Sequence, residues 1–388
     1  MPSRSETRIR TRPALHRKLT DLILDEIHSG RLPLGAKLPS QAELVARYQV
    51  SVNTVRQSLA TLEKRGIIRK EHGRGSFVSL QSGRREERRE LGHLGLIFER
   101  ADQPEDQAAE TEIVSAFVDV CRRRGIRFTC VETTVDAHAG GGELIRTFDG
   151  VNLDAICVFL HSGEGAGDRL APLAREFAAP VAMFPSFERH PFPIDRVDID
   201  LEAGLRQLMQ YLLQLGHRRI AYVSSHVAEC LAGDPQRITG GRWQAYRDAL
   251  AESGVAVDPS RLVEIPYGRE PDEAIGRRVI ELVRRDDPVT AIFAGNDWMA
   301  RHVMEWLWRA GIHVPRDVSL AGLDDVSFAR HLVPPLTTVA CPYTRAARAV
   351  IELMRKRLGD VNRPPEHVTI PSELVIRESV RPAGEHSA

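Results

Sequence analysis

Residues 51–66 read SVNTVRQSLATLEKRG, and their apolar side chains follow the period of an α-helix. Val55, Leu59 and Leu62 fall at positions i, i+4 and i+7, which predicts one apolar stripe along an amphipathic helix. Ser51 stands just before this stripe and is expected to cap the helix. The opposite face of the first turns is polar and carries Asn53, Thr54, Arg56 and Gln57. This end of the helix is therefore the part suited to meet a partner.

Two more helices are expected before this segment and a hairpin after it. Residues 12–29 repeat apolar side chains at helical spacing and are followed by Gly30, a common helix stop. Those side chains are Leu15, Leu19, Leu22, Ile23 and Ile27. Residues 40–48, SQAELVARY, begin with a capping box in which Ser40 precedes Glu43 by three residues. Residues 66–71 and 75–80 favour strands, and the glycine-containing turn HGRG joins them.

Polar and basic side chains at the start of the third helix are typical of a winged helix-turn-helix that enters the DNA major groove. Asparagine can pair with adenine, and arginine with guanine or a phosphate. Over residues 12–79 the sequence strongly resembles the GntR family of bacterial transcription regulators, on the run LPSQAELVARYQVSVNTVRQSLATLEKRGIIRKEHGRGSFV. The resemblance implies DNA contacts from the helices and the wing at Ser40, Ser51, Asn53, Thr54, Arg56, His72, Gly73 and Arg74.

Two positions depart from the pattern of that family. Ala42 and Val52 stand where many members have arginine, so the resemblance implies an operator that differs from the commonest GntR-type site. Two of the expected contacts have alternatives. Arg56 could lie on a solvated helix face, and His72 could be a turn residue that touches no DNA.

The whole chain has the composition of a globular protein. Its 388 residues are 42% hydrophobic and 27% charged, which favours two or three domains. The basic N-terminus lacks a following apolar segment and no run of about 18 apolar residues occurs, so we expect a cytoplasmic protein. The five cysteines are scattered and form no CxxC pair, which argues against a disulfide framework and against a zinc site.

The net charge of zero hides an asymmetry along the chain. Residues 1–80 contain 15 Lys and Arg against 7 Asp and Glu, a charge of +8, so the other 308 residues carry −8. A small basic domain on a large acidic one is the pattern expected when only the small domain approaches a polyanion. Uneven solvation charge is the alternative.

Beyond residue 92 the pattern changes to buried strands that alternate with helices. Residues 81–92, QSGRREERRELG, lack apolar spacing and are expected to form a linker. After them come continuous apolar runs separated mostly by amphipathic helical segments: HLGLIF, DAICVFL, PVAMF, RIAYVS, VTAIFAG and VSLAGL. Such runs are typical of parallel sheets covered on both faces, and nearly 300 residues of this pattern indicate two lobes.

We therefore expect an α/β protein in three parts. An N-terminal winged helix-turn-helix of the α+β class covers residues 10–80, a linker covers 81–92, and a two-lobe α/β sensor domain covers 93–388. The expected lobe boundaries are about 93–197 plus 326–358 for the first lobe and about 198–325 plus 359–388 for the second.

Four segments of the sensor domain resemble the sensor of the LacI/GalR family, which is similar to periplasmic sugar-binding proteins. They are LGHRRIAYVS at 215–224, RWQAYRDALAESGV at 242–255, TAIFAGNDWMA at 290–300 and VPRDVSLAGLDDVSFARHLVPPLTTV at 314–339. With weaker similarity elsewhere, the resemblance covers about residues 93–380. A GntR-type domain joined to this kind of sensor is similar to arabinose-responsive repressors.

Ligands of such folds lie at the carboxyl ends of the strands, between the lobes. Asn296 and Asp324 each follow a predicted strand. The resemblance adds Arg242 as a ligand-binding arginine, in an RxxGY-like pattern in which Ala245 replaces glycine. An arginine fork or a carboxylate can bond two neighbouring hydroxyls, as a polyhydroxylated ligand requires. The other effector-binding candidates are Tyr343, Tyr267, His161, Glu99 and Arg100.

Several of these candidates have structural alternatives. Asn296 could cap the following helix, and Asp324 could cap the turn to Val326. Arg242 could pair with a surface acid, and Tyr343 could belong to the core between the lobes.

Two departures from the LacI/GalR pattern put the usual aldose ligand in question. The acidic segment ERADQPEDQAAETE follows the first strand where relatives often have an Asn-Pro-aromatic stretch. Pro185 and Ser186 stand where many relatives have an aspartate.

Together these features predict a ligand-responsive, DNA-binding transcription regulator that represses genes for carbohydrate uptake or breakdown. We expect a homodimer formed through the sensor domain, with double-stranded operator DNA and a sugar or sugar derivative as partners, and no membrane, cofactor or metal. The alternatives are a GntR-type fusion with an enzyme, a sensor of a non-sugar metabolite, and a protein that only binds a solute. The sequence has no GxSxG, HExxH or P-loop motif, which argues against the enzyme.

Overall fold

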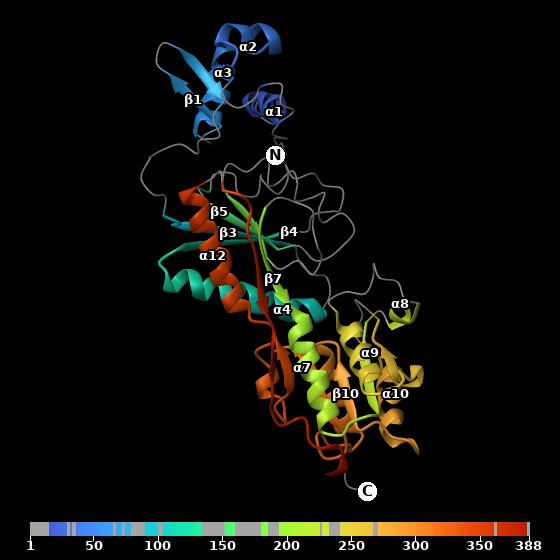
Figure 1. Ribbon diagram of the computed structural model, residues 1–388. Helices are drawn as coiled ribbons and strands as arrows, with labels where there is room; N and C mark the ends of the chain where they lie inside the picture. Colours follow the sequence, from blue (N-terminus) through green and yellow to red (C-terminus); the bar gives the residue numbers. More distant parts are fainter. Residues whose placement is uncertain are drawn as a thin grey trace, which may run out of the picture. The chain divides into compact units, whose positions relative to one another are not determined.

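The computed structural model divides the chain into two compact units, which are described separately (Figure 1). Among the described residues, one unit holds the helices and hairpin between residues 15 and 78, and the other holds both large sheets. We call the helices and hairpin of the first unit the N-terminal domain and the second unit the C-terminal domain. The structure describes residues 15–28, 32, 36–64, 67–71, 74–78, 90–99, 104–133, 151, 153–159, 180–184, 194–225, 227–232, 241–266, 271–360 and 363–385.

The N-terminal domain has the order of elements that the sequence predicts. Three helices precede an antiparallel hairpin: α1 (Leu15–His28), α2 (Gln41–Tyr48), α3 (Val52–Lys64), β1 (Ile68–Glu71) and β2 (Gly75–Val78). The segment before α2 adds an antiparallel bridge from Lys37 to Phe77 of β2. The hairpin is therefore joined to the helices by backbone pairing as well as by side chains.

The apolar stripe of α3 is buried as predicted. Val55 and Leu62 are 0% exposed and pack in one core with α1, α2 and the hairpin. The stripe of α1 is narrower than the sequence predicts, because Leu15 is 65% exposed and Leu22 is 41% exposed. Only the part of α1 that faces α3 contributes to this small core.

Both predicted helix caps are present. The Glu43 N–H donates to Ser40 Oγ at 3.3 Å, and the Ser40 N–H donates back to the Glu43 carboxylate at 2.6 Å. These hydrogen bonds hold the pKa of Glu43 below its ordinary value. The Thr54 N–H donates to Ser51 Oγ at 3.1 Å, which fixes the start of α3.

The first large sheet of the C-terminal domain is entirely parallel, with the order β13-β7-β6-β5-β3-β4. Its strands are β3 (His93–Glu99), β4 (Arg127–Thr133), β5 (Ala155–Phe159), β6 (Val181–Met183), β7 (Asp195–Asp200) and β13 (His367–Pro371). Helices α4 (Pro104–Arg123) and α12 (Tyr343–Gly359) pack against each other and against this sheet (Figure 1).

The second large sheet has the order β14-β12-β11-β10-β8-β9, and only β14 is antiparallel. Its strands are β8 (Ile220–Ser224), β9 (Leu262–Glu264), β10 (Ala291–Ala294), β11 (Ser319–Asp324), β12 (Thr337–Ala340) and β14 (Glu373–Val375). The accompanying helices are α7 (Leu201–Gln214), α8 (Val227–Ala232), α9 (Arg242–Glu252), α10 (Glu273–Arg284) and α11 (Asp297–Arg309), with short 3₁₀ turns at Pro259–Arg261, Ala329–His331 and Ala383–Glu385.

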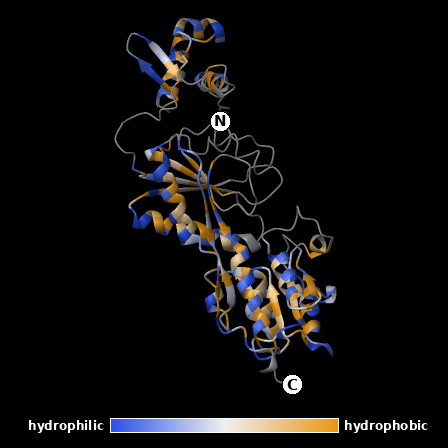
Figure 2. Ribbon diagram, viewed as in Figure 1, coloured by the Kyte–Doolittle hydropathy of each residue, from blue (hydrophilic) through white to orange (hydrophobic). Residues whose placement is uncertain are grey.

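Continuous apolar strands are buried on both faces, as the sequence predicts. In β10, Phe293 points into the core under α7 and α9, whereas Ile292 points into the core under α10 and α11. Figure 2 shows the strands as largely hydrophobic and the helices as mixed. None of the helices within the described ranges has the length and apolarity needed to cross a bilayer.

The lobe boundaries need a correction on the C-terminal side. The sequence places residues 326–358 in the first lobe, but β12 lies in the second sheet and only α12 packs on the first. It places residues 359–388 in the second lobe, but β13 pairs with β7 in the first sheet. Strand pairing across such a distance is a tertiary contact, which local periodicity does not encode. Residues 81–89 of the expected linker lie outside the described residues.

The chain crosses between the two sheets after β7, after β12 and after β13, and these crossings pack together as a hinge. The Ser372 N–H and hydroxyl both donate to the Asp200 carbonyl, at 3.0 and 2.7 Å. The Gly204 N–H donates to Ser372 Oγ at 3.1 Å. A Cβ at Gly204 would lie 2.5 Å from Val339 Cγ1, so the closely packed hinge requires glycine there.

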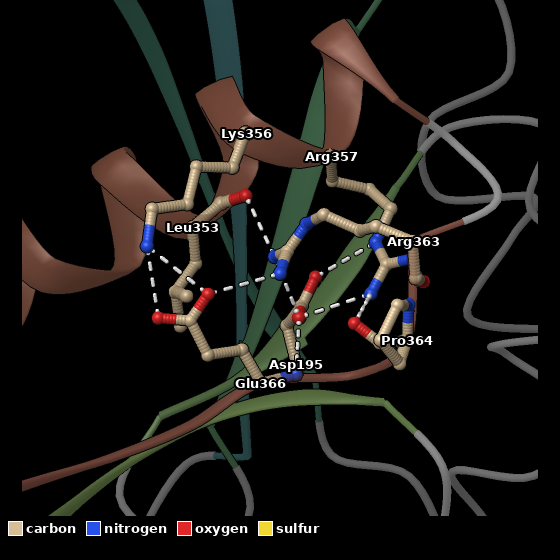
Figure 3. Close-up of polar contacts among 7 residues, drawn as sticks. All are labelled: Asp195, Leu353, Lys356, Arg357, Arg363, Pro364 and Glu366. Atoms are coloured by element: carbon tan, nitrogen blue, oxygen red, sulfur yellow. Dashed lines mark hydrogen bonds and ion pairs between the residues drawn. The ribbon is translucent and has the colours of Figure 1, made fainter.

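A buried ion-pair network joins α12 to the start of β7 (Figure 3). Asp195, whose side chain is 1% exposed, accepts from Arg357 Nε at 2.9 Å and from Arg363 Nη2 at 2.7 Å. It also accepts the Glu366 N–H at 2.9 Å. Lys356 donates to the Glu366 carboxylate at 2.9 Å and holds the pKa of Glu366 below its ordinary value. This network therefore holds the segment between α12 and β13 against the start of β7.

Candidate DNA-binding surface and effector site

The polar end of α3 is open to solvent in the N-terminal domain. Asn53, Arg56 and Gln57 are exposed, and Thr54 is half-buried. Arg56 Nε lies 3.4 Å from Gln41 Oε1 at the start of α2, which aligns the guanidinium along the surface. The exposed amide of Asn53 and the guanidinium of Arg56 can reach base edges or phosphates if this end of α3 enters a groove.

The two serines predicted as DNA contacts also act as helix caps. Ser51 Oγ accepts the Thr54 N–H and lies 2.7 Å from Thr54 Oγ1. Ser40 forms the reciprocal capping box with Glu43. Both serines are exposed, so their side chains remain accessible at the two helix starts.

The wing presents Arg74. Its side chain is 78% exposed, and its Nη1 lies 3.2 Å from Glu71 Oε2. Gly75 follows it with φ of 115°, which only glycine adopts readily, and thereby turns the hairpin. His72 and Gly73, the other two predicted wing contacts, lie outside the described residues.

In the C-terminal domain, three predicted effector residues share one environment at the carboxyl ends of the strands of the second sheet. Burial raises the pKa of Cys341, just after β12, well above its ordinary value. Asp324 adds to that rise in pKa, and Arg242 opposes it. Burial, then Cys341 and Asp324, also raise the pKa of Tyr343, against the influence of Arg242. The opposite charges of Arg242 and Asp324 therefore act on the same two side chains.

Arg242 is positioned by the start of α9. Gly241 precedes it with φ of 68° and brings the chain sharply into the helix. The Nε atom of Arg242 is buried and has no hydrogen-bond partner among the described residues. The alternative prediction is an ion pair between Arg242 and a surface acid, and the described residues form no such pair. Arg242 as a whole is half-buried, and a buried donor atom without a partner is a candidate for a hydrogen bond to a ligand acceptor.

The side chains of Asn296 and Asp324 both have partners within the protein, and Asp324 Oδ1 accepts from Cys341 Sγ at 3.7 Å. Asn296 Oδ1 accepts the Met299 N–H at 2.8 Å and caps α11, as its alternative predicts. Only its amide nitrogen is left for a ligand. Asp324 does not cap the turn to Val326, because the Val326 N–H donates to Asp297 Oδ2 at 3.0 Å.

Asp297, which the sequence analysis does not single out, begins α11 and bonds to residues beside Asp324 and on β12. It is 0% exposed and accepts from Thr338 Oγ1 at 2.6 Å. Burial, reinforced by Asp324, raises the pKa of Asp297 well above its ordinary value. A Cβ at Gly322 would lie 2.3 Å from Asp297 Oδ1, so this carboxyl fits only beside a glycine. That pairing across two strands leaves no local pattern in the sequence.

The backbone at the end of β11 is strained. Asp324 has φ of 111° and Asp325 has φ of 53°, in the region that favours glycine. Asp325 is held by an ion pair to Arg377 at 2.5 Å. This ion pair anchors the backbone directly after Asp324.

Tyr343, the third residue of this environment, is 7% exposed and lies in the main core, as its alternative predicts. Glu99 ends β3 in register with Thr133, in the first sheet. Arg100, His161 and Tyr267 lie outside the described residues.

One contact links the first sheet's helix α4 to the loop that follows Asp324. Glu112 Oε1 accepts the Ser327 N–H at 2.6 Å. Ala108, one turn earlier in α4, packs against the core under α10 and α11. The neighbouring amides of Val326 and Ser327 are thus held by carboxyl groups from the two different lobes.

Family models match both parts of the chain. Residues 15–78 match the model described as bacterial regulatory proteins, gntR family. Residues 209–380 match the model described as a periplasmic binding protein-like domain. The fold is therefore an N-terminal helix-turn-helix DNA-binding domain followed by a periplasmic-binding-protein-like α/β domain with two sheets.

The similar curated proteins are transcription regulators. GalR of Escherichia coli is 39% identical over 183 residues, which is 47% of this chain and 50% of GalR. CelR of Thermobifida fusca is 32% identical over 188 residues, which is 48% of this chain and 52% of CelR. The chain thus spans about half the length of these relatives.

The similar solved structures support the fold. A CelR–cellobiose complex aligns with a TM-score of 0.57 at 24% identity, over 85% of this chain and 92% of that one. A LacI-family regulator from Rhizobium etli aligns with a TM-score of 0.59 at 24% identity, over 75% of this chain and 99% of that one.

Proposed function

We propose that this chain is a ligand-responsive, DNA-binding transcription regulator that acts in the cytoplasm and represses genes for carbohydrate uptake or breakdown. The observation that carries the proposal is the pairing, on one chain, of a gntR-type domain with a periplasmic-binding-protein-like domain. The first exposes the polar end of α3, and the second gathers Arg242 and Asp324 at its strand ends. The protein is not an enzyme in this proposal.

DNA recognition falls to the start of α3 and to the wing. Asn53 and Arg56 supply donors and acceptors for base edges, and the caps at Ser40 and Ser51 orient the two helices. Arg74 supplies charge to a phosphate beside the groove. Val52, at 47% exposed, replaces the arginine common in the GntR family, so the operator differs from the commonest one.

The effector is a sugar or sugar derivative held by Arg242 and Asp324. The unsatisfied Nε of Arg242 donates to one hydroxyl of the sugar, and the Asp324 carboxylate accepts from the hydroxyls next to that one. Asn296 adds an amide donor. The comparison with a cellobiose-binding relative favours a carbohydrate over a non-sugar metabolite.

Effector binding changes the lobe arrangement and through it the spacing of two DNA-binding domains in a homodimer. The Glu112–Ser327 contact joins the loop after Asp324 to α4. Just after α4, the Arg127 N–H donates to the carbonyl of Gly92, which lies at the end of the expected linker. A ligand bound at Asp324 therefore shifts the population of lobe arrangements, which is the free energy that couples effector to DNA. Exposed Val333, at 89%, and Val118, at 44%, are apolar groups for the dimer contact.

The experiment is a selection of DNA sequences by the full chain, followed by anisotropy titrations of the selected operator with sugars, uronates, sugar phosphates and amino acids. We expect one class of sugar to change operator affinity at least tenfold and to raise the unfolding temperature. A response only to a non-sugar compound would overturn the carbohydrate assignment. Tight operator binding that no compound alters would overturn the ligand response.

A further inference from the structure

The end of α4 carries a group of exposed arginines that the effector site does not use. Arg122 and Arg123 form its last turn, with side chains 74% and 52% exposed. Arg127 follows at the start of β4, and Arg355 lies on the neighbouring helix α12; both are exposed. We call Arg122, Arg123, Arg127 and Arg355 the linker-edge arginines.

These arginines leave a local excess of positive charge. Asp119 lies 3.4 Å from Arg122 and 3.3 Å from Arg123, so one carboxylate serves two guanidinium groups. Arg124, between them and Arg127, is neutralised by its ion pair with Glu352 of α12. The side chains of Arg127 and Arg355 have no ion pair or hydrogen bond within the described ranges. Four arginines against Asp119 and against Asp154, which accepts the Gly92 N–H at 2.9 Å, leave a charge of +2, although residues 81–388 carry −8.

A rigid turn holds the group in place. Gly125 ends α4 with φ of 67°, and the Ile126 N–H donates to the Cys121 carbonyl at 3.0 Å. This is the usual hydrogen-bonded close of a helix at a left-handed glycine. The Arg124–Glu352 pair then fixes α12 beside the turn, one helical turn before Arg355.

The group lies where the chain enters the C-terminal domain. Arg127 is in register with His93 on the adjoining strand, and its N–H donates to the Gly92 carbonyl at 2.8 Å. The twelve residues 79–90, which separate β2 from this edge, can span at most about 40 Å. DNA held by the N-terminal domain therefore stays within reach of an edge only a few residues from the end of that tether.

Helix electrostatics account for part of the group only. Basic side chains in a last turn are stabilised by the helix dipole, which explains Arg122 and Arg123. Arg127 lies beyond the helix, and Arg355 belongs to another helix with no acidic partner among the described residues. Their shared edge requires a different reason, and duplex DNA is the polyanion that the proposed function brings to it.

We propose that the linker-edge arginines bind backbone phosphates of the DNA that flanks the operator. This inference rests on the proposed function. The contacts are independent of sequence, because guanidinium groups on phosphates carry no information about the bases. They add affinity on long DNA, release counterions, and extend the protected region beyond the part that the N-terminal domains read.

The test compares two lengths of DNA with the full chain. One duplex carries the selected operator alone, about 20 bp, and the other carries it within about 60 bp. The test variant is Arg122→Gln/Arg123→Gln/Arg127→Gln, which keeps the Arg124–Glu352 pair. The matched control is Arg206→Gln/Arg247→Gln/Arg277→Gln, which removes three exposed arginines from helices of the second sheet.

We expect the test variant to bind the long duplex several-fold more weakly than the wild type. Its slope of log K against log salt should fall by about 2 to 3, at about 0.9 per phosphate contact. Both variants should bind the short duplex like the wild type, and the control should also bind the long duplex like the wild type. Arg127→Gln/Arg355→Gln, which breaks no ion pair, should reproduce part of the loss if the triple variant unfolds.

Three outcomes would overturn the inference. An unchanged affinity and salt slope on the long duplex would show that the arginines touch no DNA. Equal losses of affinity on the short and the long duplex would show that the arginines act on the operator itself and not on the flanking DNA. A test variant that dissociates into monomers in light scattering would show that this edge joins copies of the chain. Failure of the proposed function looks different, because the wild type would then prefer no selected DNA sequence.

Discussion

Asn53 and Arg74 are expected to contribute to DNA binding in different ways. Because an amide paired with adenine discriminates by about 1 to 3 kcal/mol, Asn53→Ala should lose that much preference for the operator over unrelated DNA. Arg74→Ala should weaken binding to both DNAs alike and lower the salt slope by about 0.9. Anisotropy titrations on both DNAs at several salt concentrations separate the two effects. Equal losses on both DNAs for Asn53→Ala would show that Asn53 only positions the helix.

Asp297 should make the stability of the C-terminal domain depend on pH. Burial raises the pKa of Asp297, so the folded state binds this proton more tightly than the unfolded chain does. The stabilisation is full below the ordinary carboxyl pKa and is lost as the pH rises through the raised pKa, by at most about 1.4 kcal/mol per pH unit. Asp297→Asn should remove that slope.

Urea unfolding followed by tryptophan fluorescence measures this difference, because all four tryptophans lie in the C-terminal domain. Asp317→Asn is the control with the opposite sign, since the hydrogen bond from Arg316 holds the pKa of Asp317 below its ordinary value. Asp317 stabilises the folded state at neutral pH, and this contribution disappears as the pH falls through its lowered pKa. Asp317→Asn should therefore lower the stability at neutral pH but not at low pH. Parallel pH curves for the wild type and Asp297→Asn would contradict the expectation for Asp297.

Single residues were predictable where their role is local. The capping box of Ser40 and Glu43, the cap of Ser51 and the buried stripe of α3 follow from spacing alone. The role of Asp297 was not predictable, because Asp297 begins a helix and its partners, Gly322 and Thr338, lie on two later strands. The same limit explains Leu15, whose helical spacing is right but whose position lies beyond the reach of α3.

At the level of elements, the Asp195 network should be essential to the joint between α12 and the first sheet. Asp195→Asn leaves two largely buried guanidinium groups, 14% and 13% exposed, without their carboxylate and should lower the unfolding free energy by about 3 kcal/mol. Lys356→Gln breaks only the exposed pair with Glu366 and should cost less than about 1 kcal/mol. Urea unfolding of both variants is the measurement, and similar losses for the two would contradict it.

The hinge should tolerate no side chain at Gly204. Alanine is the better helix former, yet its Cβ would meet Val339 and Ser372, so Gly204→Ala should lower the unfolding free energy by about 1 to 3 kcal/mol. Gly359→Ala, at the end of α12, meets nothing within 4 Å and serves as the control. A Gly204→Ala variant as stable as Gly359→Ala would show that the crossings can separate without cost.

The strands and helices were predictable from their periods, but their assignment to lobes was not. Each apolar run from HLGLIF to VSLAGL forms a parallel strand, because a strand buried on both faces has to be apolar throughout. β12 and β13 exchange lobes relative to the expected boundaries, because the hydrogen-bonding partner decides the sheet. A pairing strand that is distant in the sequence has no effect on the local pattern of apolar residues.

For the whole molecule, Glu112 should set how strongly the effector acts. Glu112→Ala removes a contact that exists only while the two lobes touch beside Asp324. The concentration of effector that gives half its effect on operator binding should rise about fivefold, or about 1 kcal/mol. Glu281→Ala, on the surface of α10, is the control and should leave it unchanged. A rise of the same size for both variants would show that surface charge, and not the contact, is responsible.

The interleaving of the two lobes also fixes the order in which the protein can mature during synthesis. β13 and β14 are the last strands of the two sheets, so the first sheet lacks a strand until translation has passed residue 371 and the second until it has passed residue 375. The helices and hairpin of the N-terminal domain need only the residues up to 78. Since domains fold as they emerge from the ribosome, the proposed DNA-binding domain is formed some 300 residues of translation before the two sheets that frame the proposed effector site are complete.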